Sequence, residues 1–241
     1  MSKQDQSRAA RAKTIDDLSE DTLGVGSTDM RTVRDILVRP RQVLEAWMTH
    51  GPTGDGRYAR PLRLYLALNG VLMLIQFLNG GSANLLRGLP PEILLPAIQA
   101  SGKTRDAFIA DADGWMSLIM VPLLATLYVF TATPLLRWWD PEKLGWRRGF
   151  RAACAYLNAW TVPLLPIAWF LYGTGPLAAL ASLAMAILGL VAFLRMGRGR
   201  WYGSPLIGGV KALVLTAAIA VVGLLGSVLV AALGLLAGRV S

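Results

Sequence analysis

The chain has 241 residues, of which 54% are hydrophobic and 16% charged, and its formal net charge is +9. Most of the charged residues lie outside a few long apolar blocks, which is typical of a membrane protein and not of a soluble protein built from amphipathic helices. The single cysteine, Cys154, excludes disulfides and thiolate metal clusters within one chain.

The N-terminal part divides into two segments. Residues 1–28 have mixed charge and few side chains to bury, so we expect a disordered cytoplasmic tail. Residues 29–50 repeat apolar side chains at helical spacing, and Pro40 divides them into two short, basic amphipathic helices. The two helices either lie on the membrane surface or pack under a helical bundle, and the sequence leaves both arrangements open.

Long apolar runs occupy the rest of the chain. The uncharged stretches reach or exceed the roughly 20 residues that cross about 30 Å of hydrocarbon. The stretch 152–194 would measure about 65 Å as one helix at about 1.5 Å per residue, and Gly173-Thr174-Gly175-Pro176 interrupts it. We therefore predict an all-α polytopic membrane helix bundle over residues 61–238. Its five transmembrane helices are expected near residues 64–79, 114–136, 151–172, 176–194 and 210–237.

The basic residues predict an orientation. Alternate segments between the spans hold 20 Lys and Arg residues against four, and the basic set faces the cytoplasm in most membrane proteins. The N-terminus is then cytoplasmic and the C-terminus outside. Abundant Arg, Ala, Gly and Leu indicate a bacterial source, hence the bacterial inner (plasma) membrane. Because the basic residues border spans, the expected partners are anionic lipid headgroups on the cytoplasmic side and not nucleic acid.

A basic segment precedes the first span. Arg57, Arg60 and Arg63 follow one another at spacing three and would form one stripe if the helix began before Pro61. Tyr58 and Trp47 are candidate interfacial aromatics beside them. The three arginines either anchor the helix end or bind an anionic lipid headgroup or a partner's acidic segment.

Few polar residues lie inside the spans. Asn69 and Gln76 share one helix face, as do Asn158 and Thr161, and these four form a candidate intramembrane polar face. They either join helices by hydrogen bonds or line a path for an uncharged substrate. No span has a charged residue at its centre, which argues against proton-coupled transport.

The last span carries two glycines at close-packing spacing. Gly234 and Gly238 are four residues apart and allow close packing against a neighbour in the bundle or self-association with a second copy. The sequence leaves both alternatives open.

Motifs for chemistry fail on their context. "AIQASGKT" (97–104) matches a relaxed phosphate-binding loop, but no buried strand precedes it, so we predict a helix over 91–100 and a second helix toward Asp113. His50 is the only histidine and stands at a predicted helix end. With no catalytic pair, metal site or cofactor motif, we predict no enzyme chemistry.

One segment resembles a known family. Thr32, Arg39-Pro40, Trp47 and "GRYARPLRLYL" from Gly56 resemble an uncharacterised bacterial inner-membrane family, a domain of unknown function. The resemblance covers roughly residues 30–80, and this chain lacks the cysteine-rich zinc ribbon of many members. The five-span plan is also similar to that of Yip-type membrane-trafficking proteins.

These patterns lead to two hypotheses. The first is an integral membrane protein without enzyme chemistry that has a lipid-associated or partner-docking role. The alternative is a permease for a neutral or lipid-like substrate.

Overall fold

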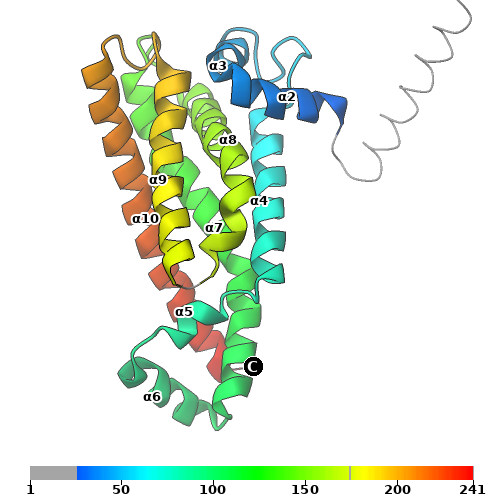
Figure 1. Cartoon of the computed structure of the whole chain (residues 1–241), viewed down its shortest axis with the longest axis vertical. Coiled ribbons are helices and arrows are strands. Elements are labelled where there is room, and N and C mark those ends of the chain that lie inside the picture. The colour runs from blue at the N-terminus through cyan, green and yellow to red at the C-terminus, as the bar shows by residue number, and fades with distance from the viewer. Residues whose placement is uncertain (1–25, 174, 241) are drawn as a thin grey trace, which may run out of the picture.

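The computed structural model describes residues 26–173 and 175–240, whose regular elements are all helices (Figure 1). Residues 1–25 of the predicted tail lie outside the described part of the chain. The helix α2 (Ser27–Val38) then begins inside the predicted tail. Pro40 separates α2 from α3 (Pro40–Thr49), as predicted, because it suits the first turn of a helix but not its interior.

Five helices are long and apolar enough to cross a membrane, which confirms the predicted class and number of spans. Three of them begin with a proline, whose missing N–H is not needed at a first helical position. Their bounds are α4 Pro61–Leu78, α7 Arg105–Trp139, α8 Trp146–Leu171, α9 Pro176–Gly197 and α10 Pro205–Val240.

All five helices are longer than the predicted spans, and α7 exceeds its prediction the most. The helix expected to end near Asp113 and the span expected from Gly114 form one continuous helix, α7, of 35 residues. A single glycine inside a helix costs only about 1 kcal/mol and does not end it, which explains the wrong boundary. At about 1.5 Å per residue α7 measures roughly 52 Å, more than the hydrocarbon core, so part of it projects beyond.

Helix α8 is the centre of the bundle. In its most apolar window 61% of the residues are buried, against 22–33% in the other four spans. Small side chains let neighbours approach closely, and Ala152, Ala153, Cys154 and Ala155 are completely buried. Helices α4, α7 and α9 pack on α8, and α10 packs on α7 and α9 (Figure 1).

The glycines of α10 pack within the chain. A Cβ at Gly234 would collide with the side chain of Met116, and one at Gly238 would come within 3.0 Å of Phe108. Both neighbours belong to α7, so close packing inside the bundle uses these two glycines. Self-association of the chain stays a prediction.

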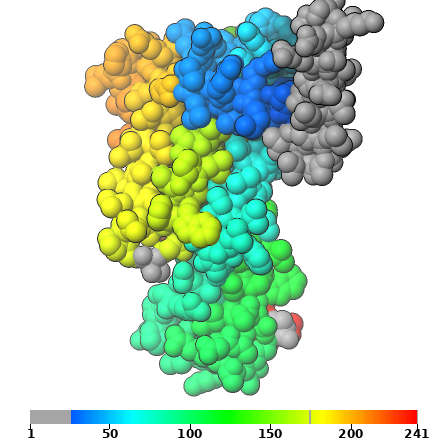
Figure 2. All heavy atoms as spheres, turned by 45° about the vertical axis from the view of Figure 1, so that its right-hand side comes forward, coloured from blue at the N-terminus to red at the C-terminus, as the bar shows by residue number. Residues whose placement is uncertain are grey.

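The two ends of the bundle carry different structures (Figures 1 and 2). At one end lies the N-terminal cap, which we define as α2, α3 and the loop 50–60. At the other end lies the α5–α6 lobe, which comprises α5 (Ala83–Arg87), α6 (Pro91–Ser101) and their loops. In the lobe, Gly102 ends α6 in the left-handed conformation and Lys103 contacts Asp111 at 2.7 Å, so "AIQASGKT" is a helix end.

Candidate functional site

The N-terminal cap packs against the end of the bundle through α3. Val43, Leu44 and Trp47 are completely buried in the same core cluster as α8. The Trp47 indole donates a hydrogen bond to the Ala59 carbonyl at 3.0 Å, and its ring meets Tyr58 edge to face. Of the two arrangements that the sequence left open, α3 therefore has the packed one.

Helix α2 combines packing with exposure. Its buried Thr32 accepts a hydrogen bond from the Ala59 amide at 2.9 Å, and its Asp29 pairs with Arg63 at 3.0 Å. Met30 and Val38 remain 64% and 62% exposed. One face of α2 is thus attached to the loop and to α4, and apolar side chains remain uncovered elsewhere on it.

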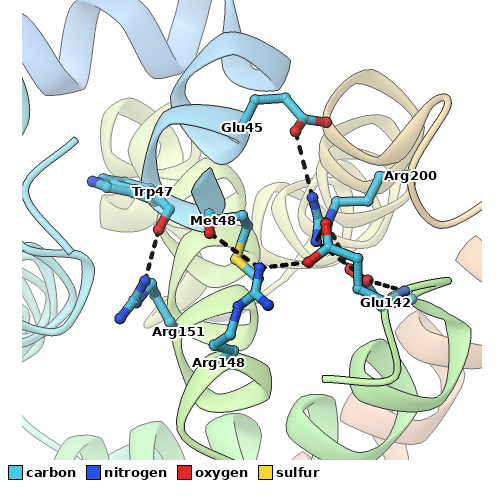
Figure 3. Close-up of polar contacts among 8 residues, drawn as sticks. Glu45, Trp47, Met48, Glu142, Arg148, Arg151 and Arg200 are labelled. Atoms are coloured by element: carbon cyan, nitrogen blue, oxygen red, sulfur yellow. Dashed lines mark hydrogen bonds and ion pairs between the residues drawn. The ribbon is translucent and has the colours of Figure 1, made fainter. Parts of the chain in front are cut away.

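Arginines of the bundle bind the carbonyl groups at the ends of the cap helices. The last turn of a helix leaves its carbonyls without partners. Arg151 donates to the Trp47 carbonyl at 2.8 Å and Arg148 to the Met48 carbonyl at 3.2 Å (Figure 3). Arg195 of α9 donates to the Leu37 carbonyl at 2.7 Å, at the end of α2. These three arginines fasten both cap helices to α8 and α9.

A buried charge network lies beside these contacts. The Arg200 side chain is 6% exposed and pairs with the fully buried Asp140 at 2.5 Å and with Glu142 at 3.0 Å. Arg200 also reaches Glu45 of α3 at 3.4 Å, and Glu142 pairs with Arg148 at 2.5 Å (Figure 3). The network joins the cap to the loop between α7 and α8 and to the loop between α9 and α10.

The network shifts the pKa values of Arg200 and Glu142. Burial alone would lower the pKa of Arg200, but Asp140 and Glu142 raise it above its usual value. The hydrogen bond from Arg148, with the charge of Arg200, lowers the pKa of Glu142. Arg200 and Glu142 are therefore charged at neutral pH.

A second group of arginines surrounds a hollow in the surface of the cap. The hollow has a volume of about 990 Å³ and lies over α3 and the loop 51–57. Arg31, Arg41 and Arg57 line it, are exposed, and make no hydrogen bond or ion pair with the residues that the structure describes. The lining acids already have neighbours, because Glu45 reaches Arg200 and Asp55 lies 3.9 Å from His50.

The predicted basic stripe does not form. The helix α4 begins at Pro61, and Arg60 before it has the extended backbone that a following proline favours. Arg57 lies in a tight loop in which Gly54, Asp55 and Gly56 have positive φ angles. Only Arg63 of the three is helical, so the three arginines share no helix face.

Two predicted interfacial aromatics are buried. Trp47 is 0% exposed and Tyr58 3% exposed, so neither is a lipid contact. Trp and Tyr combine an apolar ring with a polar group, which suits a membrane interface, but here the packing of α3 and the loop against α8 covers both side chains.

The polar residues of the spans have different hydrogen-bond partners. Asn158 donates to the Pro61 carbonyl at 2.8 Å, at the start of α4. Gln76 donates to Ser82 at 2.5 Å, near the opposite end of the same helix. Asn69 donates to the Tyr65 carbonyl within α4. It also lines a groove between α4 and α7, and the residues that line this groove do not include the other three. Gln76 and Asn158 thus join elements, and Thr161 is buried in α8.

Comparison with protein-family models, curated proteins and solved structures finds no match to the chain. The resemblance of residues 30–80 therefore stays a prediction. In the part of the chain that the structure describes, no group of three or more His, Cys, Asp or Glu residues is placed to hold a metal ion.

Proposed function

We propose that this integral membrane protein is a docking protein without enzyme chemistry, whose N-terminal cap binds an acidic segment of a partner protein. One observation carries the proposal: the arginines at this end form two groups. One group fastens the cap. The other group, Arg31, Arg41 and Arg57, is exposed around a hollow and has no ion pair among the described residues.

The position of the hollow favours a soluble partner over lipid. The buried face of α3 presents Val43, Leu44 and Trp47 to the bundle. The lining positions Gln42 and Thr49 lie on the opposite face of the same helix, directed away from the spans. A ligand in the hollow therefore approaches from water.

The charges favour an acidic ligand. Guanidinium groups bind carboxylates through paired, charge-assisted hydrogen bonds, and exposed arginines also accelerate the encounter with an acidic partner. Because Arg148, Arg151 and Arg195 hold the cap in place, the three lining arginines are presented on a fastened support.

The distribution of basic residues supports a cytoplasmic cap in a bacterial inner membrane. A reporter that is active only outside the cytoplasm, fused after Ser241, is then expected to be active. A stable but silent fusion would contradict this orientation. The permease alternative lacks support, because its four polar residues lie in different places.

A peptide-binding measurement tests the docking function. The protein is placed in nanodiscs of neutral phosphatidylcholine and titrated with a fluorescent poly-glutamate peptide, followed by anisotropy. The variant Arg31→Gln/Arg41→Gln/Arg57→Gln is expected to bind about tenfold more weakly, a loss of roughly 1.4 kcal/mol. The matched control removes three exposed arginines from the other end, in Arg87→Gln/Arg105→Gln/Arg239→Gln, and should bind like the wild type.

Three results would overturn the docking proposal. Wild type and triple variant could bind the peptide equally, or the control could lose as much affinity as the triple variant. The arginines could also affect only the binding of anionic vesicles and not of the peptide, which would assign the cap to the membrane surface.

A further inference from the structure

A groove between α4 and α7 opens on the side of the bundle. It has a volume of about 430 Å³, within the range of about 300–1,000 Å³ of ligand pockets. Helix α4 packs mainly on α8 and less extensively on α7. The lining is apolar on both walls: Leu62, Leu66 and Met73 on α4, and Val121, Val129 and Phe130 on α7.

The hydrogen-bond donors in the groove already have acceptors within the chain. The Tyr65 hydroxyl crosses from α4 to the Ala125 carbonyl of α7 at 2.9 Å. Asn69 donates to the Tyr65 carbonyl at 2.7 Å, and Thr126 to the Pro122 carbonyl at 2.8 Å. A polar solute would lose its hydration there without gaining these donors, so the groove suits a hydrocarbon.

The groove has the depth of one lipid leaflet. Its lining positions on α4 extend from Leu62 to Met73, which is about 16 Å at about 1.5 Å per residue. The hydrocarbon core measures about 30 Å, so the groove covers about half of it. Leu62 is in the first turn of α4, and the groove therefore lies in the half next to the N-terminal cap.

A cation lies one helical turn from the cap end of the groove. Phe150 of α8 lines the groove, and Arg147 precedes it by three residues, so both lie on one face of α8. Arg147 is exposed and makes no hydrogen bond or ion pair with the described part of the chain. An arginine in this position attracts the phosphate of an anionic lipid.

We propose that the groove binds one acyl chain of an anionic phospholipid from the leaflet next to the cap, with the phosphate of its headgroup at Arg147. The site is independent of the docking function of the cap, because it uses a different face and different arginines. It is a binding site for a structural or regulatory lipid.

Native mass spectrometry of the delipidated protein in detergent tests the site. The protein is titrated with phosphatidylglycerol and with phosphatidylcholine of the same acyl chains. The wild type is expected to bind one phosphatidylglycerol at least fivefold more tightly than phosphatidylcholine. Arg147→Gln should lose this preference while still binding both lipids, and its control, the exposed Arg198→Gln, should keep it.

A second variant tests the acyl chain. Gly70 lines the groove, and a Cβ there meets no atom within 4 Å, so the side chain of Gly70→Leu can extend into the groove. It should weaken the binding of both lipids at least fivefold. Gly209→Leu, at an equally open position of α10, should not.

Either variant can overturn the site. If Gly70→Leu binds both lipids like the wild type, the acyl chain of the lipid does not occupy the groove. If Arg147→Gln keeps the preference for phosphatidylglycerol, the headgroup does not contact Arg147. Poly-glutamate binding by the cap, measured on the same variants, should remain unchanged and separates this site from the docking function.

Discussion

The two ends of the bundle are held together by polar networks of different size. At the cap end, charged side chains bind helix-end carbonyls and one another, and the carbonyl contacts join residues 100 to 158 positions apart, such as Arg148 with Met48 and Arg195 with Leu37. At the other end, the Ser82 amide donates to Asp113, and Lys103 reaches Asp111 and the Gly238 carbonyl. Because the cap contacts cross between elements, they fix the cap relative to the spans, as the proposed docking surface requires.

Removing the buried cation should produce the largest effect. Arg200→Met leaves the fully buried Asp140 without its partner, which costs about 3–5 kcal/mol for a buried pair. We expect a strong loss of thermal stability for the purified protein in detergent. The exposed neighbour Arg198 supplies the control, since Arg198→Met should leave the stability nearly unchanged.

The double variant Arg200→Met/Asp140→Leu sharpens this test. Replacing both members of a buried pair by apolar groups removes the unpaired charge, so much of the lost stability should return. A double variant as unstable as Arg200→Met would show that the loss arises from packing and not from charge.

A substitution at the other end should have an intermediate effect. Gly234→Leu forces a side chain into Met116 of α7, and overpacking of this kind costs about 1–3 kcal/mol. Thermal unfolding should show the loss, whereas poly-glutamate binding by the cap should persist. The open position Gly209 provides the matched control, Gly209→Leu. Loss of peptide binding in Gly234→Leu would mean that the two ends are coupled.

Acid should weaken the cap end through Glu142. Its pKa is below the ordinary value of 4.5 in the folded protein, so its stabilising contribution is complete above that value and disappears as the pH falls through the lowered pKa. From about pH 5 to about pH 3.5, the melting temperature of the wild type should therefore fall more than that of Glu142→Gln. Because Glu142 is 47% exposed, the difference should be modest, and parallel profiles would contradict it.

The number of spans could be predicted because it depends on local properties. A run of apolar residues long enough to cross the hydrocarbon is visible in one segment, and prolines such as Pro40 and Pro61 mark helix starts by their missing N–H. The sequence did not predict the continuous α7, because Gly114 indicated a helix boundary whereas the helix continues through it.

The candidate site depends on tertiary packing, which the sequence pattern does not contain. Arg200 and Asp140 are 60 residues apart, and no spacing or motif in the sequence pairs them. Trp47 is of a residue type that is common at membrane interfaces, and only the packing of α3 on the bundle shows that it is buried. Likewise, helical spacing placed Asn69 and Gln76 on one face without showing that different neighbours meet them.

The smallest effect is expected at an ion pair on the surface of the cap. Arg34 pairs with Asp35 at 2.9 Å, but its side chain is 73% exposed, and exposed pairs contribute about 0–1 kcal/mol. Arg34→Gln should therefore leave the melting temperature nearly unchanged, although it removes the same charge as Arg200→Met. This contrast separates burial from charge as the cause of stability in the cap. A loss in Arg34→Gln comparable to that of Arg200→Met would show that net charge, and not the buried network, holds the cap on the bundle.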